Sequence, residues 1–161
     1  PQADRGVLVL ATESTVRGGA YAHEILARNP AGRIYSRPCP LLVALAEEGR
    51  NDDELARLAL AEYIAPAVQA LPEISSVVLG CTHFPVFRGA LADLLDPSIR
   101  VVDSAQTTAA AVSELLRAKD LLATTGAGAV TLLATDGVRR FRRVGAQFLG
   151  EAITELELVD L

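Results

Sequence analysis

The stretch VVLGCTH, residues 77–83, decides the fold because it joins a short apolar run to a glycine and then to a group of polar side chains. Val77–Leu79 has the length and the β-branched content of a buried strand. Gly80 allows the sharp turn that ends such a strand. In open parallel sheets, ligands bind just beyond the carboxyl ends of the strands. Residues 81–83 are therefore candidates for a functional site.

Apolar runs of the same kind alternate with segments of helical periodicity along the rest of the chain. We expect strands at residues 7–10, 33–36, 77–79, 101–102, 130–134 and 153–159. Helices are expected at residues 21–28, 41–48, about 52–70, 86–95, 104–118 and 138–148. Asn51 or Asp52 should cap the longest helix, and Pro66 should bend or break it. Alternating strands and helices are typical of an α/β protein with a parallel sheet.

Two further polar loops follow predicted strands. Thr12–Thr15 comes after the first strand, and Asp103-Ser104, which reads mainly as a helix cap pair, comes after the fourth. Backbone N–H groups and hydroxyls at such positions suit a small anionic ligand, for example a carboxylate.

The composition excludes several classes of function. The chain has 161 residues, of which 50% are apolar, and a net charge of -5, so it has no broad attraction for phosphate backbones. Nucleic acid is therefore not expected as a partner. Its apolar runs are shorter than the ~20 residues that cross a bilayer, so no membrane span is expected. The first five residues lack the features of a secretion signal, which predicts a cytoplasmic protein. The start at a proline instead of Met indicates a piece of something longer.

Cys81 is the candidate nucleophile or base. A lone cysteine after an apolar strand is more often a buried filler than a reactive thiol. The glycine turn, the ligand-facing strand end and an expected helix N-terminus favour the reactive thiolate. His83 is near enough to share protons with the sulfur, although surface packing is its other interpretation. Cys39, between two prolines, is interpreted as structural.

Neither a metal nor a cofactor is expected. The chain contains two cysteines and two histidines, from which the usual four ligands of zinc are hard to assemble. Gly126 and Gly128 are a weak match to a dinucleotide-binding loop. Thr15 and Thr82 are interpreted equally well as helix caps or as substrate ligands.

Five stretches together resemble the glutamate racemase family. VLGCTHFP at residues 78–85 resembles the family motif LGCTHYP, and LATESTV at 10–16 with GAY at 19–21 is similar to GTxGTVxSGAY. CPLLV at 39–43 with EEG at 47–49 is similar to CPLFVPLVEEG. VDS at 102–104 and the segment from Thr135 to Gly150 match late parts of the family pattern. The resemblance covers essentially the whole chain.

The resemblance implies an α/β, flavodoxin-like parallel sheet with helices on both faces. Residues 1–98 would form the second racemase lobe, which carries Cys81. Residues 99–161 would complete the first lobe, whose N-terminal part, with the other catalytic cysteine, has no match here. Residues from about Ile99 onward would then lack their sheet partners.

The resemblance also implies an activity, namely cofactor-independent interconversion of L- and D-glutamate by two thiols, which supplies D-glutamate for peptidoglycan synthesis. Cys81 and His83 would be catalytic, and Thr82, Thr15 and Thr12 would bind the substrate. The expected partner is glutamate, a homodimer is compatible with the pattern, and this chain alone is expected to be inactive.

Three alternatives stay open. The first is an enzyme like aspartate racemase, which tends to have Glu at the position of His83. The second is a cysteine hydrolase that uses Cys81 and His83 and needs an oxyanion hole. The third is a non-catalytic fragment that binds small acids.

Overall fold

The computed structural model describes residues 6–71, 73–126 and 128–160. The first five residues, on which the argument against a secretion signal rests, lie outside them. The chain divides into two compact units, one ending at Thr107 and the other beginning at Thr108. Among the described residues, the helices lack the combination of length and apolar character that a bilayer crossing requires.

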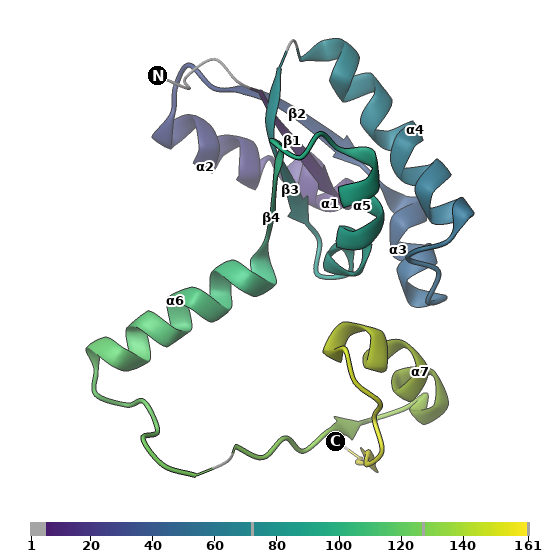
Figure 1. Ribbon diagram of the computed structural model, residues 1–161, viewed down its shortest axis with the longest axis vertical. Coiled ribbons are helices and arrows are strands. Elements are labelled where there is room, and N and C mark those ends of the chain that lie inside the picture. Colours follow the sequence, from purple (N-terminus) through teal and green to yellow (C-terminus); the bar gives the residue numbers. More distant parts are fainter. Residues whose placement is uncertain (1–5, 72, 127, 161) are drawn as a thin grey trace. The chain divides into compact units, whose positions relative to one another are not determined.

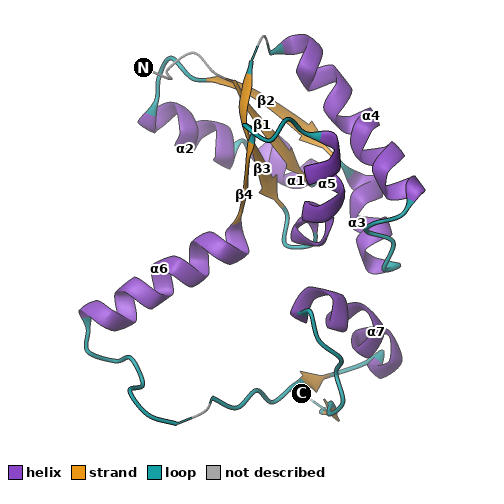
Figure 2. Ribbon diagram, in the orientation of Figure 1, coloured by secondary structure: helices purple, strands orange, loops and turns teal. Residues whose placement is uncertain are grey.

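The first unit is built on a four-stranded parallel sheet (Figures 1 and 2). The strands are β1 (Gly6–Ala11), β2 (Arg33–Pro38), β3 (Ile74–Gly80) and β4 (Arg100–Asp103), and their order in the sheet is β2-β1-β3-β4. Every pairing is parallel. The parallel α/β sheet expected from the sequence is therefore confirmed.

Helices connect these strands and lie on both faces of the sheet, with α2 on one side and α3, α4 and α5 on the other (Figure 1). Their bounds are α1 (Glu13–Gly18), α2 (Ala20–Arg28), α3 (Pro40–Glu47), α4 (Glu54–Ala70), the 3₁₀ turn η1 (Phe84–Phe87) and α5 (Arg88–Leu94). Helix α6 (Ser104–Ala118) follows the last strand and runs from the first unit into the second. The contacts of α4 with α3 and α5 make these three helices one layer.

The core lies between the sheet and the layer of α3, α4 and α5. Leu8 pairs in register with Val77, and Leu10 with Leu79, so that all four side chains are on the same face of the sheet. They are at most 1% exposed. Alternation along a strand places their neighbours on the opposite face, toward α2. The buried side of the sheet thus fixes the register of the strand that leads to Cys81.

Three local expectations need correction. The cap of α4 is Asp53, whose Oδ1 accepts the Ala56 N–H at 2.9 Å, and not Asn51 or Asp52. Pro66 does not break α4, which runs on to Ala70. The helix expected at residues 86–95 is divided into η1 and α5.

The strand at residues 100–103 also departs from expectation. β4 pairs with β3 through Ser76–Arg100, Val77–Val101, Val78–Val102 and Leu79–Asp103. The expectation that residues from Ile99 onward lack sheet partners is therefore wrong for β4, because the exposed edge of β3 accepts it.

The second unit has little regular structure after α6. It contains a two-residue parallel pair, β5 (Leu133–Ala134) with β6 (Glu157–Leu158), and helix α7 (Val138–Leu149). Both strands are shorter than the sequence predicted. Large apolar side chains stay exposed in this unit, for example Val130 at 81% and Leu158 at 62%.

Candidate functional site

The strand order creates a topological switch point at the end of β1. From β1 the chain moves to β2 on one side, and it then returns to β3 on the other side, so the connections diverge between β1 and β3. Ligands of open α/β sheets bind at such a switch point, beyond the carboxyl ends of the strands. Ala11 and Gly80 form the last register pair there. Thr12 and Cys81 are the next residues, so the fold brings these two predicted site residues to the same place.

Gly80 is required at this position because α2 packs closely against it. A Cβ atom on Gly80 would lie 2.8 Å from Cε2 of Tyr21 and 3.1 Å from Cβ of Ala11. Both distances are shorter than an ordinary carbon contact. The glycine therefore lets the strand end pass under Tyr21.

Cys81, His83 and Glu47 form a continuous array of polar groups. Sγ of Cys81 lies 3.7 Å from Nδ1 of His83. Nε2 of the same ring lies 3.3 Å from Oε1 of Glu47, at the end of α3. The His83 side chain is 33% exposed and that of Glu47 is 41% exposed. Solvent and a ligand can therefore reach the array.

This geometry suits proton transfer. When Glu47 accepts the Nε2–H bond, Nδ1 of the neutral ring is left as an acceptor that faces the thiol. The thiol proton can then move to His83 and return. Sequence reasoning had placed a helix N-terminus beside Cys81, but the structure places η1 there and begins α5 only at Arg88. The imidazole is thus the polar partner that the structure gives to the sulfur.

Glu47 is a residue that sequence reasoning missed as a functional group. In the sequence it stands out only as part of the EEG stretch at residues 47–49. The one sequence signal is a pair of glutamates, residues 47 and 48, at the end of an otherwise apolar helix. Nothing in the spacing from Glu47 to His83 indicates that they meet.

The loop after β1 presents two of the three predicted threonines. Thr12 caps α1, and its Oγ1 accepts the Thr15 N–H at 3.3 Å and lies 2.9 Å from Oγ1 of Thr15. Beside this loop is a hollow of about 430 Å³, which is lined by Thr12, Glu13, Ser14, Arg17, Pro40 and Val43. Hydroxyls and a guanidinium are groups that bind a carboxylate. Thr12, which caps α1, thus also lines this hollow together with Arg17 and the acidic Glu13, whereas Thr15 is not part of the lining.

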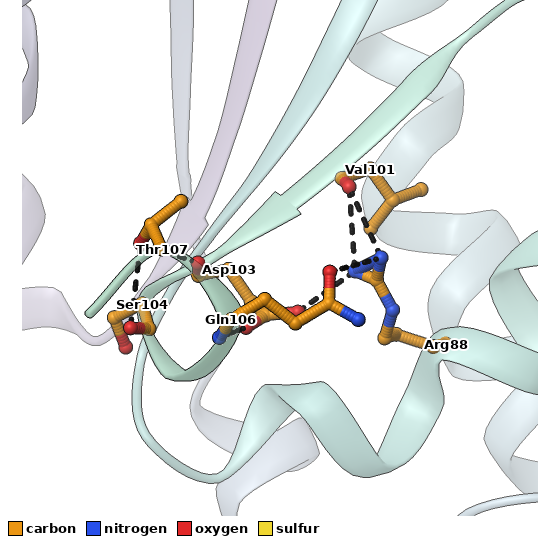
Figure 3. A network of polar contacts seen from close by, with 6 residues as sticks. All are labelled: Arg88, Val101, Asp103, Ser104, Gln106 and Thr107. Carbon is orange, nitrogen blue, oxygen red and sulfur yellow. Dashed lines mark hydrogen bonds and ion pairs between the residues drawn. The ribbon is translucent and has the colours of Figure 1, made fainter. Parts of the chain in front are cut away.

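The other two predicted polar groups behave differently. Thr82 is exposed between Cys81 and His83. Asp103 is 2% exposed, and its Oδ1 accepts the Gln106 N–H at 2.9 Å (Figure 3). The expectation that Asp103 caps α6 is therefore confirmed, and its carboxylate is turned away from solvent.

Cys39 is a core residue. Its side chain is 0% exposed, and Sγ donates to the backbone oxygen of Arg37 at 3.3 Å. Burial raises the pKa of the Cys39 thiol to about 12, against the smaller opposing effects of the Arg37 charge and an Ala11 backbone hydrogen bond. A negative charge on Cys81 adds to the raised pKa. Cys39 thus stays protonated at neutral pH and cannot act as a base there.

The two thiols are separated by one strand. Cys39 follows β2 and Cys81 follows β3, with β1 between them. Two strand spacings amount to about 9–10 Å, whereas disulfide-bonded Cα atoms are at most about 7 Å apart. Both cysteines are free thiols, and the sheet keeps them apart.

We predict that iodoacetamide at pH 8 alkylates Cys81 on the order of 1000-fold faster than Cys39. A pKa of about 12 for Cys39 leaves a thiolate fraction of only ~10⁻⁴ at that pH. Peptide mapping by mass spectrometry after brief labelling measures both rates in one sample. Faster labelling of Cys39 would reverse the assignment of the reactive thiol.

A hollow of about 520 Å³ is in the second unit. It is lined by residues 130–132 and 154–157 together with Arg142. This lining includes neither a cysteine nor a histidine, in contrast to the array of Cys81, His83 and Glu47. Within the described ranges, no group of three or more His, Cys, Asp or Glu side chains is arranged to hold a metal ion.

Comparison with known proteins finds similar glutamate racemases. The chain is 38% identical over 154 residues to the glutamate racemase of Geobacter metallireducens, a match that covers 95% of this chain and 56% of that protein. A glutamate racemase from Syntrophus aciditrophicus is also 38% identical, over 157 residues. The chain thus spans a little more than half the length of these relatives.

Solved structures give the same result. The glutamate racemase of Francisella tularensis, determined in complex with D-glutamate, superposes with a TM-score of 0.83 at 33% identity and covers 97% of this chain and 58% of its own. The enzyme from Thermus thermophilus, in complex with β-chloro-D-alanine, gives a TM-score of 0.78 at 34% identity. The family model described as Asp/Glu/Hydantoin racemase matches residues 2–112, which is more than half of the chain. The chain belongs to the Asp/Glu/hydantoin racemase family.

Proposed function

We propose that this chain is the Cys81-bearing part of a glutamate racemase that works without a cofactor. The observation that carries the proposal is the array in which His83 lies 3.7 Å from Cys81 and 3.3 Å from Glu47. This array stands at the switch point of the sheet, beside a loop of threonine hydroxyls. The relatives in the comparison are glutamate racemases, and one of them was crystallised with D-glutamate. The activity of these relatives supports glutamate as the substrate of the protein to which this chain belongs.

Racemisation requires a base on one face of Cα and an acid on the other. In the proposed mechanism the Cys81 thiolate removes the Cα proton of one enantiomer, and a thiol on the opposite face returns a proton. For the other enantiomer the two roles exchange. His83 takes up and returns the Cys81 proton, and Glu47 orients the ring through Nε2.

The substrate is held by the loops around Cys81. Thr12 and Thr15, next to Arg17, would bind a carboxylate, and the exposed Thr82 hydroxyl would bind the amino group or the second carboxylate. Cys39 cannot provide the opposing thiol because it is buried on the far side of β1. The opposing thiol therefore has to come from a lobe outside these residues.

We also propose that the residues after β4, from 104 to 161, serve to complete that other lobe. The exposed apolar side chains of the second unit support this role, since folded domains seldom leave so many uncovered. β4 belongs to the sheet of the first unit, so the part free to complete another lobe begins after it. We further predict that the complete protein supplies D-glutamate for peptidoglycan synthesis. A homodimer is also a prediction.

One alternative is favoured by a specific observation. A Cys–His–Glu array is also the arrangement of a cysteine hydrolase, in which the thiolate attacks a carbonyl carbon. Such an enzyme changes the mass of its substrate, whereas racemisation does not.

The test uses the protein with its other lobe present and L-glutamate as the only added compound. We expect the circular dichroism of L-glutamate to decay to zero with no change in product mass, and Cys81→Ala to slow the decay by about 10²–10⁴-fold, since it removes one acid–base group. Cys39→Ala is the matched control and should keep most of the rate. An unchanged rate for Cys81→Ala would remove Cys81 from the mechanism.

A further inference from the structure

Arg88 belongs by its backbone to the turn that carries Cys81. Its N–H donates to the oxygen of Pro85 and so closes η1. The same turn begins where the Phe84 N–H donates to the Cys81 oxygen at 3.1 Å. Phe84 and Phe87, both 0% exposed, anchor the turn in the core. Backbone hydrogen bonds of this turn thus join Arg88 to the segment that carries Cys81.

The Arg88 side chain holds a different element. Nη1 donates to Oδ2 of Asp103 at 2.8 Å, and both terminal nitrogens lie 3.3 Å from the Val101 oxygen. Nη2 also donates to Oε1 of Gln106 at 3.1 Å. Figure 3 shows the guanidinium between β4 and the start of α6. One side chain thus contacts the strand and the helix that follows it.

The carboxylate of Asp103 depends on this contact. Its side chain is 1% exposed, and its two oxygens are divided between Arg88 and the Gln106 N–H that begins α6. A buried carboxylate that loses its ion pair is strongly destabilising, because the charge stays without water. Arg88 is therefore the ion-pair partner of the buried carboxylate that caps α6.

The rest of α6 offers little to fix it. Along its described length, Ser104–Ala118, this helix has no buried residue, and Val112 and Leu115 are 46% and 54% exposed. Its first turn is held by Asp103 and by Thr107, whose Oγ1 donates to the Asp103 oxygen at 2.8 Å. The side-chain contacts described here for α6 are thus those of its first turn.

We propose that Arg88 is a positioning residue that couples the Cys81–His83 loop to the first turn of α6. In the complete enzyme, α6 begins the segment proposed to complete the other lobe. The coupling would then help to fix where Cys81 stands with respect to the opposing thiol. That last consequence rests on the proposed function, whereas the coupling itself is a property of this chain alone.

Hydrogen exchange of this chain tests the coupling without any substrate. In Arg88→Met we expect the backbone N–H groups of residues 106–108 and of residues 82–84 both to exchange about tenfold faster, because each segment loses the residue that ties it to the other and opens locally more often. The N–H groups of Leu8 and Leu10 in the core should change little. Alkylation of Cys81 by iodoacetamide should change in rate in the same variant.

Arg57→Met is the matched control. Arg57 carries the same charge and pairs with Asp93 at 3.0 Å, and its side chain is 37% exposed compared with 35% for Arg88. It should leave both segments unchanged. Arg88→Lys keeps a positive charge beside Asp103 but loses the two terminal guanidinium nitrogens that contact Val101 and Gln106. It should therefore restore thermal stability while residues 106–108 and 82–84 still exchange faster, and it replaces Arg88→Met if that variant does not fold.

Faster exchange at residues 106–108 with no change at 82–84, in either Arg88 variant, would overturn the proposal and leave Arg88 as a local support of α6. Full restoration of both segments by Arg88→Lys would also overturn it, because charge alone would then suffice. Neither result depends on racemisation, so a failure here is distinct from a failure of the proposed function.

Discussion

Residues 1–161 on their own are expected to leave L-glutamate unracemised, whereas the protein with its other lobe should convert it fully. A single thiol acts on one face of Cα only. The sequence holds two cysteines, and Cys39 is 0% exposed, with a pKa raised to about 12. Cys81 is therefore the one thiol in the chain that a substrate can meet. The decay of the circular dichroism of L-glutamate measures the difference.

The control for this experiment is the folded state of the isolated chain, which near-native helix content and selective alkylation of Cys81 would establish. Separate addition of the other lobe should bring back turnover. If the isolated folded chain interconverts the enantiomers at a rate near that of the complete protein, the mechanism with two thiols is wrong and a one-site mechanism must replace it.

The sheet of the first unit could be predicted because its strands carry a local signal. Val7–Leu10 and Val77–Leu79 are short apolar runs that end in polar or glycine residues, and burial on one face of the sheet fixes them in register. The ligand-binding end of the sheet followed from the same pattern. The position of Cys81 was therefore accessible from the sequence.

The sequence predicted the wrong residue or the wrong length in two situations. In one, neighbouring residues are equally suited to the same role, and in the other, a segment depends on partners far away in the chain. Residues 51–53 are all good helix caps, so the sequence could not single out Asp53. β5 and β6 have two residues each although longer apolar runs surround them, because strand length depends on the neighbours that a sheet offers. The apolar runs at residues 130–134 and 153–159 predicted full strands, whereas only two residues of each pair in the second unit.

The contact of Glu47 with His83 could not be predicted from the sequence. It lies on α3, and His83 follows β3, so they meet only because α3 and η1 pack against each other under the sheet. The Arg88–Asp103 pair is hidden in the same way, since its members belong to α5 and β4. Residues that follow the same strand can be recognised as neighbours from the sequence. Partners that belong to two different elements can be recognised only once the packing of those elements is known.

With the other lobe restored but its cysteine replaced by alanine, Cys81 should exchange the Cα hydrogen of one glutamate enantiomer with solvent deuterium at least about 100-fold faster than that of the other. Removal and return would then use the same face, so deuterium enters without inversion. Proton NMR of each enantiomer in deuterated buffer follows the loss of the Cα signal. Cys81→Ala in the same background is the matched control and should abolish the exchange, since both thiols are then gone. Equal exchange of both enantiomers would show that Cys81 is not confined to one face and would contradict the proposed mechanism.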